Sequence, residues 1–116
     1  PELKEFVMPL AKAFARLQAA TQHVALSGMS DADEAGAASA DYLRLFGLCA
    51  LGFMWAEMSR ISVEKLSSNA EEQIFYENKL KTSRFFMARL LPETSSLLSK
   101  ITAGKETIMS LDESAF

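Results

Sequence analysis

Apolar side chains recur through the first part of the chain at alternating spacings of four and three residues. This spacing places them on one face of a helix, while lysine, arginine and glutamine fill the opposite face. The positions on the apolar face are Leu3, Val7, Leu10, Phe14, Leu17, Thr21 and Val24. Pro9 falls inside the pattern, so either the helix bends there or residues 1–8 form a separate turn. Gly28 suits the position just beyond the end of this helix.

The next stretch, residues 28–41, is rich in small and acidic residues and carries no large side chain beyond Met29. It predicts a loop that becomes the amino-terminal end of a second helix. Asp31 together with Glu34, or Ser39 alone, is expected to cap that helix, and Gly36 leaves its first residue open.

An uncharged run extends from Leu45 to Ala56, between Arg44 and Glu57. It is too short to span a bilayer, which requires about 20 apolar residues. A run that is apolar on every side of a helix predicts burial on all sides, as in the central helix of a bundle.

A buried β-strand is the alternative for such a run. We favour a helix, because the helical pattern continues through Met58, Ile61 and Leu66 without a turn signal. Small residues in the run are expected to let neighbouring helices approach closely; they are Gly47, Gly52 and Ala56.

A third helix is predicted after a cap at Ser67, Ser68 or Asn69, with Glu71 and Glu72 in its first turn. Its stripe again alternates spacings of four and three, through Tyr76, Leu80, Ser83, Met87, Leu90, Thr94, Leu97 and Ile101. Pro92 predicts a kink near residues 88–92, and Gly104 closes the helix. Residues 105–116 are expected to pack as one short turn of helix. The predicted fold is all-α, an antiparallel bundle of three long helices plus a short C-terminal helix.

Composition narrows the classes of function. The chain has 116 residues, enough for one domain, with 12 basic and 15 acidic residues and a net charge of −3. The basic residues are scattered, which argues against binding to nucleic acid. A single cysteine excludes an internal disulfide and a multi-thiolate metal site, and it suits a reducing, cytoplasmic compartment. The chain opens Pro-Glu-Leu-Lys, without an initiator methionine or a secretory signal. We therefore expect residues 1–116 to be a single helical domain from the C-terminal part of a longer chain.

Few residues offer chemistry. The only histidine, His23, has Ala20 three positions before it, so the Glu-x-x-His motif of di-iron bundles is absent. His23 is expected to be a partly exposed packing residue. Cys49 lies in the most apolar run, where a thiol is usually inert. The sequence contains neither a Gly-x-Ser-x-Gly turn nor a glycine-rich phosphate loop. We expect no catalytic, cofactor-binding or metal-binding residue in these 116 residues.

The third predicted helix is locally basic, through Lys79, Lys81, Arg84 and Arg89. These residues form either an anion site or a solvated face paired with Glu77 and Glu93, and the solvated face is favoured. Methionine and phenylalanine side chains could line a ligand groove, although at helical spacing they are more often core.

Two stretches resemble a known domain. Residues 42–58, Tyr-Leu-Arg-Leu-Phe-Gly-Leu-Cys-Ala-Leu-Gly-Phe-Met-Trp-Ala-Glu-Met, and residues 75–104, which begin Phe-Tyr-Glu-Asn-Lys-Leu-Lys-Thr-Ser-Arg-Phe-Phe, carry most of the resemblance. They are similar to the C-terminal helical domain of one branch of bacterial acyl-CoA dehydrogenases, which includes methylthiopropanoyl-CoA dehydrogenases. The closing Ile-Met-Ser-Leu-Asp-Glu-Ser-Ala-Phe is also similar to the way these proteins end.

The resemblance implies a longer parent enzyme that uses FAD to remove hydrogens from Cα and Cβ of an acyl-CoA. It implies that the catalytic glutamate, the flavin contacts and most of the acyl-CoA pocket lie upstream, so FAD is expected in the parent and not in these residues. Lys81 and Arg84 are the positions to inspect for contact with the cofactor or the core. The expected partners are the upstream core and further copies in a homo-oligomer, with no nucleic acid and no membrane. The alternative is a free-standing helical dimerisation module without flavin chemistry.

Overall fold

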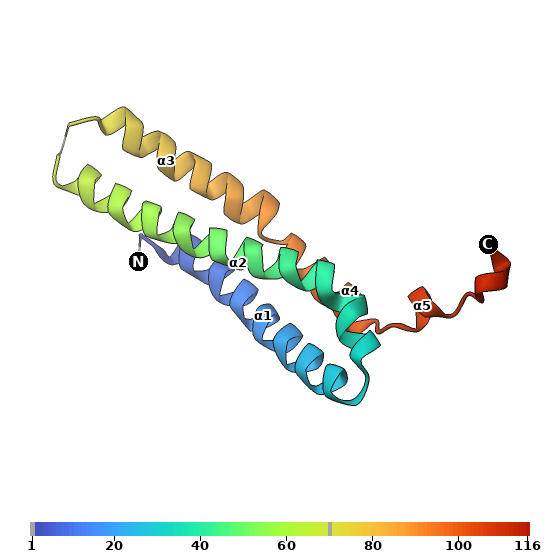
Figure 1. Cartoon of the computed structure of the whole chain (residues 1–116). Coiled ribbons are helices and arrows are strands. Elements are labelled where there is room, and N and C mark those ends of the chain that lie inside the picture. Colours follow the sequence, from blue (N-terminus) through green and yellow to red (C-terminus); the bar gives the residue numbers. More distant parts are fainter. Residues whose placement is uncertain (1, 70) are drawn as a thin grey trace.

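The computed structural model describes residues 2–69 and 71–116, and every regular element in this part of the chain is helical (Figure 1). The elements are α1 (Lys4–Ser30), α2 (Ala32–Ser67), α3 (Gln73–Phe85), the π-helical turn η1 (Phe86–Leu90), α4 (Glu93–Thr102), α5 (Glu106–Met109) and the 3-10 turn η2 (Glu113–Ala115). The predicted all-α bundle is confirmed.

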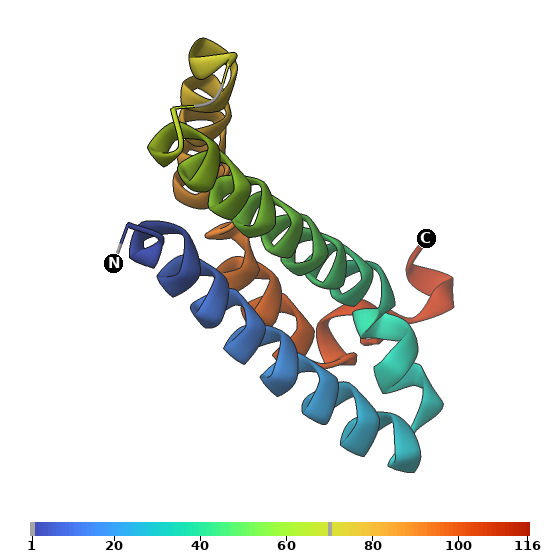
Figure 2. The ribbon, with the colours of Figure 1, turned by 90° about the vertical axis from the view of Figure 1, so that its left-hand side faces the viewer.

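Helix α2 is the longest helix, and the other long helices pack along it in an elongated molecule that measures 66 × 28 × 15 Å. It runs antiparallel to α1, and the chain then returns along it as α3, η1 and α4 (Figures 1 and 2). Helix α3 packs on the later part of α2, and α4 packs against both α1 and α2. The third long helix of the prediction is therefore two helices joined by η1.

Pro9 lies within α1, which begins at Lys4, so a separate turn over residues 1–8 is wrong. The first turn is closed by backbone bonds from Phe6 and Val7 to the Leu3 carbonyl, both 3.0 Å long. Pro9 is the sixth residue of α1, so its ring removes the i→i−4 backbone bond to the Glu5 carbonyl, but the helix continues past it.

The loop predicted over residues 28–41 is also wrong. Helix α1 continues to Ser30, and α2 begins two residues later, after Asp31. The Asp31 carboxylate accepts a hydrogen bond from the Asp33 backbone N–H at 3.0 Å, which confirms Asp31 as the N-cap. Ser39 lies inside α2 and donates to the carbonyl of Gly36.

Gly28 explains how so short a joint can reverse the chain. It lies inside α1, and a Cβ added to it would come within 3.1 Å of the Ala35 Cβ on α2. The two helices therefore meet almost at backbone contact. The small residues that suggested a loop permit this approach, and alanine has the highest helix propensity.

The return of the chain after α2 differs from the prediction as well. The hydroxyls of Ser67 and Ser68 donate back to carbonyls at the end of α2, so they do not cap α3. Glu72, at φ 64°, directly precedes α3, which has no side-chain cap and does not include the predicted acidic first turn.

The interruption expected near residues 88–92 is confirmed in position, but it breaks the helix. The Leu91 N–H bonds to the Phe86 carbonyl at 3.0 Å, a π-type spacing, and Pro92 then supplies no N–H. Helix α4 begins anew at Glu93.

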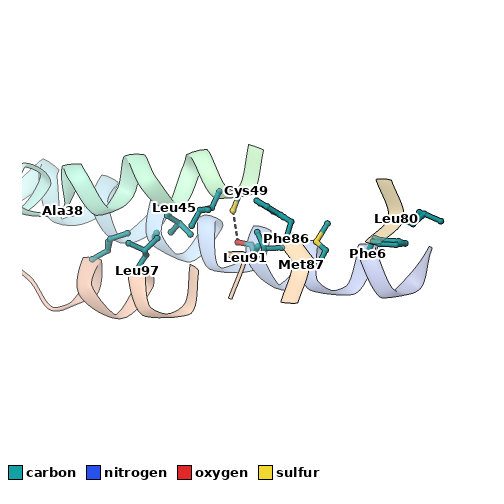
Figure 3. Close-up of a cluster of buried hydrophobic side chains, with 13 residues drawn as sticks. Phe6, Ala38, Leu45, Cys49, Leu80, Phe86, Met87, Leu91 and Leu97 are labelled. Atoms are coloured by element: carbon teal, nitrogen blue, oxygen red, sulfur yellow. Dashed lines mark hydrogen bonds between the residues drawn. The ribbon is translucent and has the colours of Figure 1, made fainter. Parts of the chain in front are cut away.

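The core lies where α1, α2 and the returning segment of α3, η1 and α4 face one another (Figure 3). Its fully buried large side chains include Phe6, Leu45, Leu91, Leu97 and Ile101. Gly52, on α2, faces Leu10 of α1 and Leu91, which directly follows η1: an added Cβ would be 3.0 Å from Leu10 and 3.2 Å from Leu91. The expectation that Gly52 permits a close approach is confirmed.

Helices α2 and α3 meet through buried serines. The Ser59 hydroxyl lies 2.6 Å from that of Ser83 and 2.7 Å from the Trp55 carbonyl. Small hydroxyl side chains let the two backbones approach while their polar atoms stay bonded.

Gly104, at φ +83°, follows the end of α4, as predicted. The Lys105 ammonium pairs with Asp31, and its backbone N–H donates to Glu34 at 3.1 Å. Beyond this anchor the chain points away from the bundle (Figure 1). The tail forms two short turns instead of one, and its large apolar side chains are exposed, so the predicted packing of the tail is wrong: Ile108, Met109, Leu111 and Phe116.

Candidate interaction surface

The uncharged run of α2 has two different faces. The prediction that it is buried on all sides is wrong, because α1, α3 and α4 cover only one side. Leu45 and Cys49 are completely buried on that inner side. The exposed side, which we call the outer face, consists of Leu43, Phe46, Gly47, Ala50, Leu51, Phe53 and Met54.

The outer face is large for a protein of this size. Leu43 is 73% exposed, and Phe46, Leu51, Phe53 and Met54 each expose about half of their surface. With about 200 Å² for each fully exposed side chain of this size, these residues and Phe14 present roughly 600 Å² of apolar surface. A standard protein–protein interface covers about 800 Å² on each partner. The outer face is thus close to the size of an interface.

The outer face is uneven, and its hollows would allow side chains of a partner to pack into it. A groove of about 310 Å³ separates α1 from α2 and is lined almost entirely by apolar side chains: Phe14, Leu17, Phe46, Cys49, Ala50, Phe53 and Met54. A hollow of about 280 Å³ lies beside it, lined by Ala40, Leu43, Arg44, Gly47, Leu48 and Leu51.

Gly47 contributes to this relief by its lack of a side chain. A Cβ added there would meet nothing within 4 Å. The expectation that Gly47 lets a neighbouring helix of this chain approach is wrong, because Gly47 faces outward.

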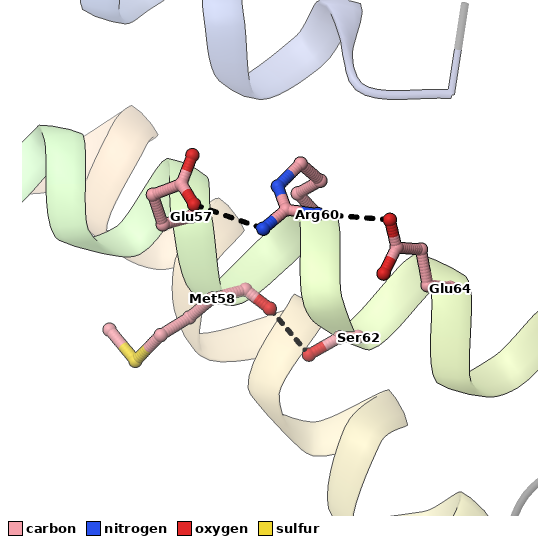
Figure 4. Close-up of polar contacts among 5 residues, drawn as sticks. All are labelled: Glu57, Met58, Arg60, Ser62 and Glu64. Carbon is pink, nitrogen blue, oxygen red and sulfur yellow. Dashed lines mark hydrogen bonds and ion pairs between the residues drawn. The ribbon is translucent and has the colours of Figure 1, made fainter.

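Ion pairs border the outer face at both ends. Arg44 donates to both oxygens of Glu93, at 2.6 and 2.9 Å, and this contact lowers the pKa of the Glu93 carboxyl and raises that of Arg44. Arg60 bonds to Glu57 at 3.2 Å and to Glu64 at 2.9 Å (Figure 4). Charge is therefore confined to the rim, as is typical of interfaces.

The structure places the two candidate reactive residues on different helices, His23 on α1 and Cys49 on α2. His23 is half-buried on α1, as predicted. Cys49 is fully buried, its thiol donates to the Ala13 carbonyl at 3.4 Å, and burial raises its pKa. A raised pKa disfavours the thiolate, so the inert reading of Cys49 is supported.

The four basic residues of the third predicted helix are not gathered into one site. Lys79 lies over the rings of Trp55 and Phe75, at 5.6 and 5.4 Å. Arg84 pairs with Glu5 on α1 at 2.9 Å. Lys81 and Arg89 are exposed.

The expected pairing of this basic face with Glu93 is wrong, because Glu93 bonds to Arg44 on α2. The partners of Glu93 and Arg84 lie on other helices, and the spacing of residues along the sequence does not specify contacts between helices.

FAD does not fit these residues on their own. Its diphosphate is usually held by a glycine-rich loop, whereas Gly28, Gly36, Gly47 and Gly52 all lie inside helices. Within residues 2–69 and 71–116, every buried side-chain nitrogen or oxygen already has a hydrogen-bond partner.

The described part of the chain holds no group of three His, Cys, Asp or Glu side chains that could bind a metal ion. Of the helices formed by these residues, none combines the length and apolarity needed to cross a bilayer.

Comparison with known proteins defines the family. The family model described as "Acetyl-CoA dehydrogenase C-terminal like" matches residues 1–112. The chain therefore belongs to this family of acyl-CoA dehydrogenase C-terminal domains. A search of curated proteins gave no match.

Spare apolar surface for a core or a second subunit was expected from the sequence, but its place on α2 was not, because the uncharged run was expected to be covered on all sides. The signal was present, since a helix that is apolar all round needs cover on all sides. Helix α1 and the returning segment of α3, η1 and α4 cannot surround α2 on all sides along its 36 residues.

Proposed function

We propose that this chain is a helical accessory domain that packs on the catalytic core of an FAD-dependent acyl-CoA dehydrogenase, with the outer face of α2 against the core. The observation that carries the proposal is the uncharged, apolar surface of about 600 Å² with ion pairs only at its rim. The family match supplies the occupant, because it describes a domain that is C-terminal to such a core.

The chemistry belongs to the core in this proposal. FAD bound there accepts the hydrogens that leave Cα and Cβ of the acyl-CoA. The residues of this chain neither touch the reacting atoms nor hold the cofactor. Their role is to cover an apolar surface of the core and to stabilise the assembled enzyme.

Finer features of the parent are part of the same proposal. The stretches at residues 42–58 and 75–104 support the branch that includes methylthiopropanoyl-CoA dehydrogenases. The single, buried cysteine is compatible with a cytoplasmic protein. The exposed tail beyond Lys105 offers a second apolar surface through which copies of the enzyme would form a homo-oligomer.

Co-purification of two separate polypeptides tests the docking. The upstream core and the 116-residue chain are co-expressed, and only the core carries an affinity tag. We expect the chain to be retained by the core and the Leu51→Glu variant to be lost, because a charge placed at this position would be buried without a partner.

Leu111→Glu is the matched control. Leu51 is 52% exposed and Leu111 is 64% exposed, so neither substitution disturbs the core of the domain. Equal retention of both variants would contradict docking through the outer face. A chain that associates with itself but is not retained by the core would instead support the free-standing dimerisation module.

A further inference from the structure

A second groove, on the other side of α1, carries positive charge. It has a volume of about 300 Å³ and lies between α1 and the turn that joins η1 to α4. Its walls combine apolar side chains with two cations: Pro9, Lys12, Arg16, Met87, Leu91 and Pro92. We propose that this groove binds a phosphate group, held by Lys12 and Arg16.

Arg16 is held in place at the groove by a buried partner. Its Nη1 donates to the Thr94 hydroxyl at 2.9 Å, and that hydroxyl donates in turn to the Leu91 carbonyl at 2.7 Å. Thr94 is completely buried. The guanidinium has five N–H donors in a fixed plane, so its remaining donors are oriented before a ligand arrives.

Neither cation of the groove is neutralised. No carboxylate among residues 2–69 and 71–116 lies within ion-pair distance of Lys12 or Arg16. The structure shows ion pairs for four of the ten other basic residues, namely Arg44, Arg60, Arg84 and Lys105, so what sets Lys12 and Arg16 apart is that both line one groove. Lys12 and Arg16 are one helical turn apart, so two positive charges converge on one space.

The neighbouring hollow does not offset this charge. It shares Pro9 and Met87 with the groove and is lined further by Glu5, Arg84 and Ala88. Glu5 and Arg84 form an ion pair with each other at 2.9 Å, so that hollow is close to neutral.

The charge and shape of the groove favour phosphate over a single carboxylate. A phosphate monoester carries about −1.5 to −2 charges at neutral pH, which matches two cations. The arginine fork fits two phosphate oxygens, and the lysine acts as a point charge. The prolines, Met87 and Leu91 exclude part of the competing water, which strengthens the attraction.

Two sources could supply this group, free inorganic phosphate or the phosphates of coenzyme A. Only the second depends on the function proposed above. The experiment is isothermal titration calorimetry of the 116-residue chain in low-salt buffer with inorganic phosphate, coenzyme A and dephospho-coenzyme A, which lacks the 3′-phosphate.

We expect saturable binding of at least one phosphate ligand. Lys12→Gln and Arg16→Gln should each weaken it by roughly tenfold, since each removes one charge-assisted contact. Lys65→Gln is the matched control, because it removes the same charge from an exposed position at the end of α2. Tighter binding of coenzyme A than of phosphate identifies coenzyme A as the source, and equal binding identifies free phosphate.

Two results would overturn the proposal. One is the absence of saturable binding for all three ligands. The other is an equal loss in the Lys65→Gln variant, which would show general attraction to cations. Lys12 is exposed, so the result for Lys12→Gln stands even if loss of the bond to Thr94 destabilises Arg16→Gln. The test contains no catalytic core, so its failure is distinct from failure of the docking proposal.

Discussion

The two faces of α2 are both uncharged between Leu45 and Ala56, but their environments are opposite. Leu45 on the inner face is fully buried against other legs of the bundle, and Leu43, two residues earlier, is 73% exposed. The same contrast separates Gly52, wedged between Leu10 and Leu91, from Gly47, which has open space before it. The inner face stabilises the domain, and the outer face is available to a partner. Hydrophobicity alone therefore does not reveal which surface a chain covers by itself.

The largest effect is expected at the leucine pair. Leu45→Ala should lower the free energy of unfolding by about 2–5 kcal/mol, because it leaves a cavity in a fully packed site. Leu43→Ala should change it by no more than about 0.5 kcal/mol. Urea denaturation followed by circular dichroism measures both. Equal costs for the two variants would contradict the assignment of inner and outer faces.

The glycine pair gives a smaller contrast of about 1 kcal/mol. Gly47→Ala should stabilise the isolated chain by about 0.8–1 kcal/mol, since alanine is the better helix former and the new methyl group meets nothing. Gly52→Ala should lose this gain, because its methyl group presses on Leu10 and Leu91. Thermal melting of both variants ranks them, and a Gly52→Ala variant as stable as Gly47→Ala would be inconsistent with the close contact.

The smallest effect is expected at the rim, where the Arg44–Glu93 pair is partly exposed. Hydrogen bonding to Arg44 lowers the pKa of Glu93 in the folded state. The pair therefore adds stability above the ordinary glutamate pKa, and this contribution is lost as the pH falls through the lowered value. The stability difference between the wild type and Glu93→Gln should shrink from about pH 7 to pH 3, as measured by urea denaturation at each pH. A difference that grows on acidification would have the wrong sign.

The sequence predicts the existence and order of the helices well, because helical periodicity records which positions face a common core. It fails where backbone geometry or tertiary contact decides. The joint at Asp31 resembled a long loop, because small residues suit both a loop and a close helix crossing. The start of α3 depends on how the chain reverses after α2, and the break at η1 depends on the N–H that Pro92 lacks. Helical periodicity encodes neither of these.

The candidate surfaces were less predictable than the fold. The apolar run was visible, but whether its outer side is covered depends on how many other helices the chain can place around it. The pairing of Arg44 with Glu93 and of Arg84 with Glu5 joins residues that are far apart in sequence. The groove at Lys12 and Arg16 likewise depends on the position of Leu91 and Pro92, which lie between η1 and α4.

The most direct test of the central claim is the reactivity of a cysteine introduced at Met54 toward a maleimide reagent, in the isolated chain and in the full enzyme. The native Cys49 is buried with a raised pKa, so its background reaction is slow. A cysteine introduced at Lys65 is the control. We expect fast labelling of Met54→Cys in the isolated chain and labelling at least about tenfold slower in the full enzyme, with little change for Lys65→Cys. Equal labelling of Met54→Cys in both contexts would contradict docking of the outer face on the core.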